Sequence, residues 1–171
     1  MDKRKKKHLV YLSLGANLGN KTLNLTNALN LLNREAGVIT KYSSIYKTAA
    51  WNMEATTPDF YNLVAELETS LLPAELLKVT QNIEKEIGRT EKSVNGKYEN
   101  RLIDIDILFY DDLKMQTENL TIPHPLLHKR NFVLYPLQEI AGSKIHPFFN
   151  KTVNQLKAES KDTTQIIIIK D

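Results

Sequence analysis

Residues 100–110, NRLIDIDILFY, alternate between two kinds of side chain with the period of two that a β-strand produces. One face of this strand is wholly apolar and carries Ile103, Ile105, Ile107 and Phe109. The other face carries Asp104 and Asp106, whose Cα atoms lie about 7 Å apart, with a leucine on each side. The apolar face requires a covering layer. The face with the aspartates (the aspartate face) is either an ordinary solvent-exposed surface or a functional site, and the rest of the chain must decide.

The apolar pattern elsewhere predicts three more strands and two helices. The further strands are the segments 9–15, 38–49 and 60–70, which are rich in β-branched, leucine and aromatic residues. One helix has apolar residues at helical spacing over 25–36 and ends at Gly37. The other begins at Pro73 and ends at Gly88. The order of elements is therefore β-α-β-β-α-β.

Two helices on one face of a four-stranded antiparallel sheet form the ferredoxin-like arrangement of the α+β class. The isoleucine face of 100–110 then lies under the helices. On the strand 60–70 the same alternation turns Asn62 to the aspartate face. Two additions are predicted after the fourth strand: a helix within 126–142, whose ends the sequence does not define because it contains Pro136, and a segment over 165–170 that either adds an edge strand or pairs with one at the surface.

Composition limits the class of protein. The chain has 171 residues, of which 42% are hydrophobic and 25% charged, which is typical of one globular domain. It has no cysteine, which fits a reducing cytoplasm, and no apolar run long enough to span a bilayer. Residues 1–7 carry a charge of +4, so the remainder carries −1 of the net +3. We expect a disordered basic tail over 1–7, a single domain over 8–171, and no nucleic-acid or membrane partner.

The aspartate pair has the surroundings of a metal–nucleotide site. The polar segments 51–59 and 89–100 are predicted to be long loops beside the aspartate face. Carboxylate oxygens bind Mg²⁺, and the metal bridges the phosphates of a substrate. Positive charge for those phosphates is available from Arg89, Lys92, Lys97, Arg101 and Arg130. No GxxxxGK[ST] segment is present, so the chain is not a P-loop enzyme.

Several motifs together resemble one known family. NRLIDIDILFY, followed by LTIPHPLLHKRNFVLYPLQEIAG, is similar to 6-hydroxymethyl-7,8-dihydropterin pyrophosphokinase of folate biosynthesis. YLSLGANLGN, SSIYKTA, PDFYNLVAELETSL and QNIEKEIGR match the same family in the same order. The resemblance covers about residues 9–142, and it disfavours the interpretation of the aspartates as an ordinary exposed face.

The resemblance implies that a pyrophosphoryl group passes from ATP to the hydroxymethyl group of the pterin, with AMP as the other product. Asp104 and Asp106 would bind two Mg²⁺ ions, and Arg89 and Arg101 would act with them as catalytic residues on the triphosphate. The implied ATP-binding residues are Gln81, Glu84, Lys92, His124 and Arg130. The implied pterin-binding residues are Thr48, Asn62 and Phe132. ATP and the pterin would be the only partners of a cytoplasmic monomer.

Structural alternatives remain for some of these residues. His124 lies between two prolines and could be a loop histidine. Phe132 adjoins Val133 and Leu134 and could belong to the core. Gln81 and Glu84, one helical turn apart, could form a solvated helix face.

Departures from the family pattern occur in the predicted loops. Glu91 stands where a second arginine is common, and Glu99-Asn100 precede Arg101 where Gly-Pro is usual. The aromatic residue that completes the pterin pocket could be Tyr98 or Trp51. These departures leave a catalytically impaired homologue as one alternative. A ferredoxin-like module that binds a nucleotide or RNA is another, although aromatic and basic side chains rather than aspartates are expected on its central strands.

Overall fold

The computed structural model describes residues 5–49, 56–88 and 102–170, and the predictions for residues 50–55 and 89–101 lie outside this part of the chain. The main sheet of the described part has the strand order β10-β3-β4-β1-β5, with β2 also paired to β4. Its strands are β1 (His8–Ala16), β2 (Val38–Tyr42), β3 (Tyr46–Thr48), β4 (Phe60–Thr69), β5 (Asp104–Tyr110) and β10 (Ile166–Ile168). All of these pairings are antiparallel.

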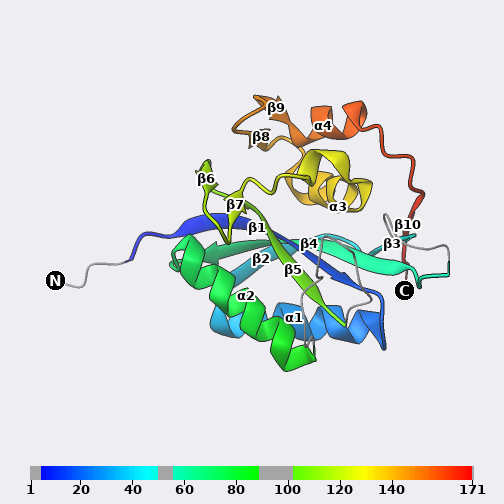
Figure 1. Ribbon diagram of the computed structural model, residues 1–171, viewed down its shortest axis with the longest axis horizontal. Coiled ribbons are helices and arrows are strands. Elements are labelled where there is room, and N and C mark those ends of the chain that lie inside the picture. Colours follow the sequence, from blue (N-terminus) through cyan, green and yellow to red (C-terminus); the bar gives the residue numbers. More distant parts are fainter. Residues whose placement is uncertain (1–4, 50–55, 89–101, 171) are drawn as a thin grey trace.

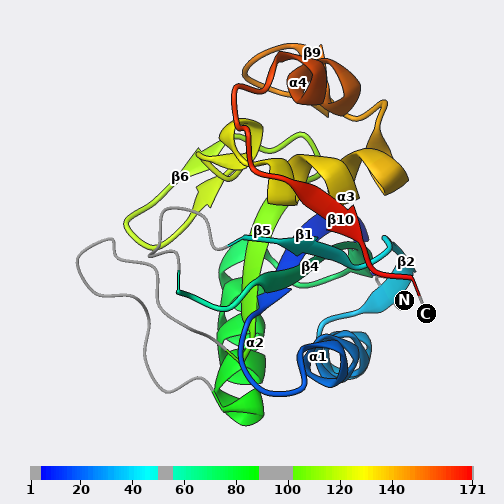
Figure 2. The same cartoon turned by 90° about the vertical axis from the view of Figure 1, so that its right-hand side faces the viewer.

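Two long helices cover one face of the sheet, as predicted. Helices α1 (Lys21–Glu35) and α2 (Pro73–Ile87) lie side by side beneath it (Figure 2). The main core between helices and sheet is filled from β1 and β5 by Val10, Leu12, Leu14, Ile105 and Ile107, among others. The elements follow the predicted order along the chain, and the sheet is antiparallel with two helices on one face, so the ferredoxin-like α+β fold is confirmed.

Local signals set the ends of both helices. The side chain of Asn20 caps α1 by accepting a hydrogen bond from the amide of Leu23 at 3.0 Å. Pro73 is the first residue of α2, and Gly88 ends this helix in the left-handed conformation with a φ of 119°. The buried face of α2 includes Ile83 and Glu84.

The strand predicted over 38–49 is in fact two strands, β2 and β3, which both pair with β4. Ser43 lies between them and makes a different contact with β4. Its amide donates to the carbonyl of Val64 at 2.9 Å, and its hydroxyl oxygen accepts from the amide of Val64 at 3.0 Å. A serine hydroxyl thus replaces one bond of the ladder, which the alternation of apolar residues cannot reveal.

The prediction that Phe109 shares a face with Ile107 is wrong. The pairing of β1 with β5 shifts register between Leu12 and Tyr11, so that Leu108 is an extra residue in β5. This β-bulge turns Phe109 to the opposite side of the sheet. There its ring makes an edge contact with Tyr11 in a second hydrophobic cluster.

This second cluster covers part of the aspartate face, which the sequence had suggested to be open. Its covering layer consists of α3 (Asn131–Ala141) and α4 (Val153–Glu159) on the side of the sheet opposite to α1 and α2 (Figure 1). Helix α3 is the one predicted within 126–142. It begins after a 3₁₀ turn over Leu127–Lys129 and continues through Pro136. The aspartates, both half-buried, lie where this layer does not cover the face completely.

The remaining elements are short. Two hairpins pair β6 (Met115–Gln116) with β7 (Thr121–Ile122) and β8 (Ile145–His146) with β9 (Lys151–Thr152). From α4 the chain returns past α3 to the sheet (Figure 2), where β10 pairs with β3 as the predicted edge strand.

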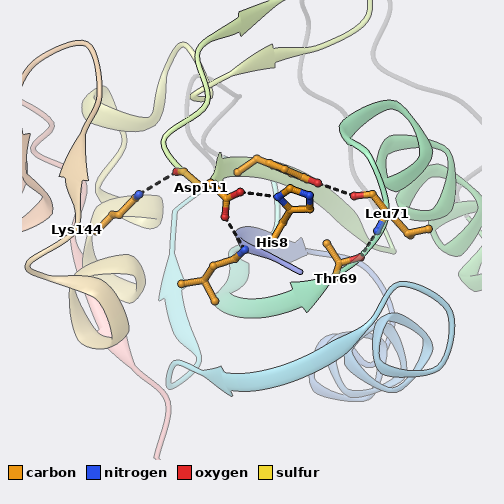
Figure 3. Close-up of polar contacts among 7 residues, drawn as sticks. His8, Thr69, Leu71, Asp111 and Lys144 are labelled. Carbon is orange, nitrogen blue, oxygen red and sulfur yellow. Dashed lines mark hydrogen bonds and ion pairs between the residues drawn. The ribbon is translucent and has the colours of Figure 1, made fainter. Parts of the chain in front are cut away.

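A polar cluster joins the start of β1 to the end of β5 (Figure 3). The carboxylate of Asp111 accepts from the amide of Leu9 at 2.8 Å and lies 2.6 Å from Nδ1 of His8. The backbone carbonyl of Asp111 accepts from Nζ of Lys144 at 2.9 Å. Burial alone would raise the pKa of Asp111, but the bonds from His8 and Leu9 outweigh it and lower the pKa. This cluster lies at the end of β5 that is far from Asp104 and Asp106.

We expect Asp111→Asn to destabilise the fold by about 1 kcal/mol at neutral pH, a hydrogen-bond value already reduced for partial solvent exposure. Asparagine tolerates the positive φ of 48° at this position. Because the folded pKa is lowered, the stabilisation is present above the unfolded pKa of about 3.9 and is lost as the pH falls through the folded value. Urea unfolding from neutral to acid pH measures this, with Asp112→Asn as the exposed control. A loss of stability that does not shrink in acid would contradict the prediction.

Candidate functional site

Strand pairing brings Asn62, Gly15 and Asp104 into one row across the sheet. Gly15 of β1 pairs with Asn62 of β4 on one side and with Asp104 of β5 on the other. In the next row on the same face, Ser13 pairs with Asp106. Directly paired residues share a face of a sheet, so the amide and both carboxylates lie on one surface. The backbones of β4 and β5 are about 10 Å apart across β1.

The two aspartates are held in place from the helix side of the sheet. Ile105, the residue between them, is buried in the main core. Its amide donates to Oε1 of Glu84 at 2.8 Å, and Glu84 itself is only 4% exposed. The alternative that Glu84 lies on a solvated helix face is therefore wrong. Gln81, one turn earlier on α2, is half-buried.

His124 is placed beside β5. Its backbone amide donates to the carbonyl of Leu108 at 3.0 Å, and its Nδ1 accepts from the amide of Leu126 at 3.2 Å. Burial lowers the pKa of His124, although the charge of Asp104 acts in the opposite direction. The ring is therefore neutral at pH 7, and with Nδ1 as an acceptor it carries its proton on Nε2. Because Leu108 follows Asp106 by two residues on β5, its bond to the His124 amide places this histidine near the aspartate pair.

Arg130 and Phe132 lie at the start of α3. Arg130 is 5% exposed, and burial lowers its pKa to about 10, so its guanidinium remains charged at neutral pH. Its Cζ lies 5.5 Å from the centre of the Phe132 ring. Phe132 is half-buried and packs against the second hydrophobic cluster, so it contributes to the core, as one of the alternatives for this residue had it. A guanidinium has several N–H donors, which can bind an anionic ligand through charge-assisted hydrogen bonds.

Thr48 and Asn62 lie on neighbouring strands and contact each other. Nδ2 of Asn62 donates to Oγ1 of Thr48 at 3.0 Å, and both residues are buried. The sequence analysis did not single out Phe60, which lies two residues before Asn62 on the same face and pairs with Thr48. The period of two, counted back from Asn62, could have identified it. An amide, a hydroxyl and an aromatic ring together suit a flat heteroaromatic ligand with a hydrogen-bonding edge.

Several predicted site residues lie outside the described part of the chain: Arg89, Lys92, Arg101 and the two alternative aromatic residues Trp51 and Tyr98. The site geometry is therefore that of the other predicted residues. The structure brings Asn62 and Thr48 together, and it places Asp104, Asp106, Glu84 and His124 around one segment of β5.

The carboxylates of this site suit Mg²⁺ better than a metal ion whose ligands all come from the protein. Within residues 5–49, 56–88 and 102–170 no group of three or more His, Cys, Asp or Glu side chains could hold a metal ion. Mg²⁺ is usually bound by one or two carboxylates, and water and substrate phosphates complete its octahedron. Asp104 and Asp106 supply this number of carboxylates.

The fold and the site define an α+β protein with a ferredoxin-like sheet and a polar, acid-bearing site on one face. Among the described residues, no helix combines the length and apolarity needed to cross a membrane.

Comparison with known proteins identifies the family. The model of the 7,8-dihydro-6-hydroxymethylpterin-pyrophosphokinase (HPPK) family matches residues 11–142. A 2-amino-4-hydroxy-6-hydroxymethyldihydropteridine pyrophosphokinase of Aquifex aeolicus is 42% identical over 151 residues, which are 88% of this chain and 91% of the relative. The protein of the same name from Porphyromonas gingivalis is 43% identical over 140 residues, or 81% and 94% of the two chains. The chain belongs to the HPPK family.

Solved structures agree on the fold. A crystal structure of Plasmodium falciparum HPPK-DHPS matches 92% of this chain with a TM-score of 0.74 at 19% identity. The match covers 46% of that longer chain, so this chain spans about half the length of that protein. At this identity the likeness concerns the fold alone.

Proposed function

We propose that this chain transfers the pyrophosphoryl group of ATP to 6-hydroxymethyl-7,8-dihydropterin in folate synthesis and releases AMP. Membership of the HPPK family over most of the chain supports this activity. The structural observation that carries the proposal is the row across β4, β1 and β5. It puts the amide of Asn62 and the carboxylate of Asp104 on one face, two strands apart. A substrate that is recognised at one end and reacts at the other can be aligned between them.

Asp104 and Asp106 are the proposed ligands of two Mg²⁺ ions that accompany ATP. When bound, the metals neutralise phosphate charge and orient the transferring group. The protein itself has to keep both carboxylates on the same face of the sheet. The buried hydrogen bond between Glu84 and the amide of Ile105 supports this, because it fixes the backbone between them.

The proposed ATP-binding residues surround β5 and the start of α3. Arg130 offers a charged guanidinium, and His124 offers an Nε2 proton to a phosphate or sugar oxygen. Gln81 and Glu84 border the nucleotide on α2. We extend the same proposal to residues outside the described part: Lys92 for ATP binding, and Arg89 and Arg101 as catalytic residues on the triphosphate.

The proposed pterin-binding residues are Thr48, Asn62 and Phe132. Thr48 and Asn62 support this proposal because their hydrogen-bonding groups are buried beside Phe60. In such a position water competes little with a planar substrate for these hydrogen bonds. Phe132 would contribute a second apolar surface from α3.

The decisive experiment incubates the protein with ATP, Mg²⁺ and the reduced pterin and identifies the nucleotide product. We expect AMP to form in step with pterin diphosphate, and neither product to form without the pterin. Formation of ADP would contradict the pyrophosphoryl transfer. ATP consumption that does not depend on the pterin would contradict the substrate.

We further infer that residues 8–171 act as a single domain and a cytoplasmic monomer, without a nucleic-acid or membrane partner. The charge of the chain supports the last part of this inference, the lack of a nucleic-acid or membrane partner, because the basic excess lies in residues 1–7. A sedimentation mass of two chains would contradict the monomer.

Deletion of residues 1–7 is expected to leave turnover unchanged. Lys7 pairs with Glu68 in a solvent-exposed contact, which stabilises little, and it lies at the end of β1 far from Gly15. The measurement is kcat and the KM for ATP of the shortened and full chains. A large rise of this KM in the shortened chain would show that the lysines act on the nucleotide.

A further inference from the structure

The start of α3 is held by a residue far along the chain. Arg130 is the N-cap residue of α3, and its carbonyl accepts from the amides of Val133 at 3.0 Å and Leu134 at 2.9 Å. The next residue, Asn131, donates its amide to Oδ2 of Asp162 at 2.8 Å. The carbonyl of Arg130 and the amide of Asn131 belong to one planar peptide group. This peptide group is therefore held at both of its polar ends.

Asp162 takes the role that an N-cap side chain usually has. A serine, threonine, aspartate or asparagine at this position accepts a hydrogen bond from an amide of the first turn. An arginine side chain has donors and no acceptor, so Arg130 cannot do this. The carboxylate of Asp162 supplies an acceptor instead, and its negative charge lies at the positive end of the helix dipole. The N-cap position is thereby free to carry a side chain with another use.

The segment 160–164 holds this carboxylate in place. Oδ1 of Asp162 accepts from the amide of Thr164 at 2.9 Å and from its hydroxyl at 2.6 Å. The side chain of Asn131, which is buried, donates to the carbonyl of Asp162 at 2.8 Å and accepts from the hydroxyl of Ser160 at 2.8 Å. Burial would raise the pKa of Asp162, but the hydrogen bonds from Thr164 and Asn131 outweigh it and lower the pKa. The carboxylate is therefore charged at neutral pH.

The peptide that Asp162 holds decides the conformation of Arg130. It follows Arg130 directly, so it fixes the ψ of this residue, which is 108°. The rotamers open to a side chain depend on its φ and ψ. Because the side chain of Arg130 is also buried, with 5% exposure, a change of its backbone cannot be absorbed by free movement in solvent. The hydrogen bond to Asp162 thus helps to define where the guanidinium lies.

We propose that Asp162 is a positioning residue for the nucleotide site, because it fixes the start of α3 and through it the guanidinium of Arg130. Asp162 lies outside residues 11–142, the part of the chain that carries the family match. The inference rests on the proposed function and adds to it a residue that acts through Arg130 and not by contact with a substrate.

The test is Asp162→Ala, with the Kd of a non-hydrolysable ATP analogue measured by calorimetry in the presence of Mg²⁺. The pterin is left out, because Phe132 in the first turn of α3 is a proposed pterin-binding residue and would add a second effect. We expect the Kd to rise about tenfold, the lower end of what the loss of a hydrogen bond to a charged group costs. An unchanged Kd in a folded variant would overturn the inference.

Arg130→Met shows whether Asp162 acts through the arginine. Methionine keeps an apolar chain in the buried position and removes the guanidinium. In this background we expect Asp162→Ala to lower Tm but to leave the Kd of the analogue within about twofold, because the group that it positions is gone. An equal rise of the Kd with and without the guanidinium would overturn the inference. A residue that only stabilises the fold would lower Tm in both backgrounds without changing either Kd, which would overturn it as well.

Two milder variants keep the inference testable where Asp162→Ala folds poorly. Asp162→Asn keeps one oxygen that can accept from the amide of Asn131, so we expect it to retain most of the affinity. Ser160→Ala removes the hydroxyl that donates to Asn131, and it should raise the Kd about threefold, as for one neutral hydrogen bond. Equal losses in the Asn and Ala variants of Asp162, or an unchanged Kd after Ser160→Ala, would overturn the inference.

Glu75→Ala is the matched control. The carboxylate of Glu75 accepts from the amide of Leu72 at 2.7 Å at the start of α2, the end of that helix far from Glu84. We expect this variant to lower Tm and to leave the Kd of the analogue unchanged, and a rise as large as that of Asp162→Ala would overturn the inference. A wild-type protein that binds no ATP analogue would refute the proposed function itself, which distinguishes the two failures.

Discussion

Asp104→Asn and Asp106→Asn are each expected to reduce turnover by about 10²-fold or more, comparable to the loss of one strong electrostatic stabiliser of a transition state. Asparagine keeps the size of the side chain but removes the charge that Mg²⁺ requires. The proteins should fold, because both positions are only half-buried and the change removes repulsion between two carboxylates on one strand face. Steady-state turnover and Tm are measured together.

The matched control is Asp112→Asn, an exposed aspartate beyond the other end of β5, whose side chain is 87% exposed. It should leave turnover unchanged. Near-normal activity of the Asp104→Asn protein would return the aspartate pair to the alternative of an ordinary solvent-exposed face. Unfolding of either site variant would show instead that the carboxylates stabilise the strand.

Glu84→Ala is expected to reduce both stability and turnover. It removes the acceptor of the Ile105 amide in a buried position, where an unsatisfied donor costs about 1–3 kcal/mol. The strand segment between the two aspartates then loses its anchor to α2. A small displacement of catalytic groups from their working positions lowers reaction rates by about 10- to 100-fold. Urea unfolding and turnover measure the two effects.

Two further variants show how Glu84 acts. Glu84→Gln keeps a carbonyl oxygen that can accept from Ile105, so we expect it to recover most of the stability and turnover. Equal loss in the Gln and Ala variants would show that the charge of Glu84, and not its hydrogen bond to the strand, is what matters. Glu86→Ala, an exposed position on the same helix, is the control and should change neither quantity.

Much of the fold is predictable because its signals are local. The period of two identifies β1, β4 and β5, and helical spacing with Gly88 identifies α2, since these patterns depend only on which side of one element faces the core. The division of 38–49 at Ser43 and the reversal of Phe109 were not predictable. Both depend on bonds or register with a partner strand: Ser43 with Val64, and the extra Leu108 opposite β1.

The sequence by itself determined the chemical groups of the site: an acidic pair on one strand face, an amide on another, and the motifs that resemble one family. Only the tertiary structure decided how they relate. Strand register placed Gly15 between Asn62 and Asp104, packing buried Glu84 beneath Ile105, and α3 buried Arg130 at its start. The physical reason is that alternation defines which face a residue takes, whereas register and packing between segments distant in sequence define which residues become neighbours.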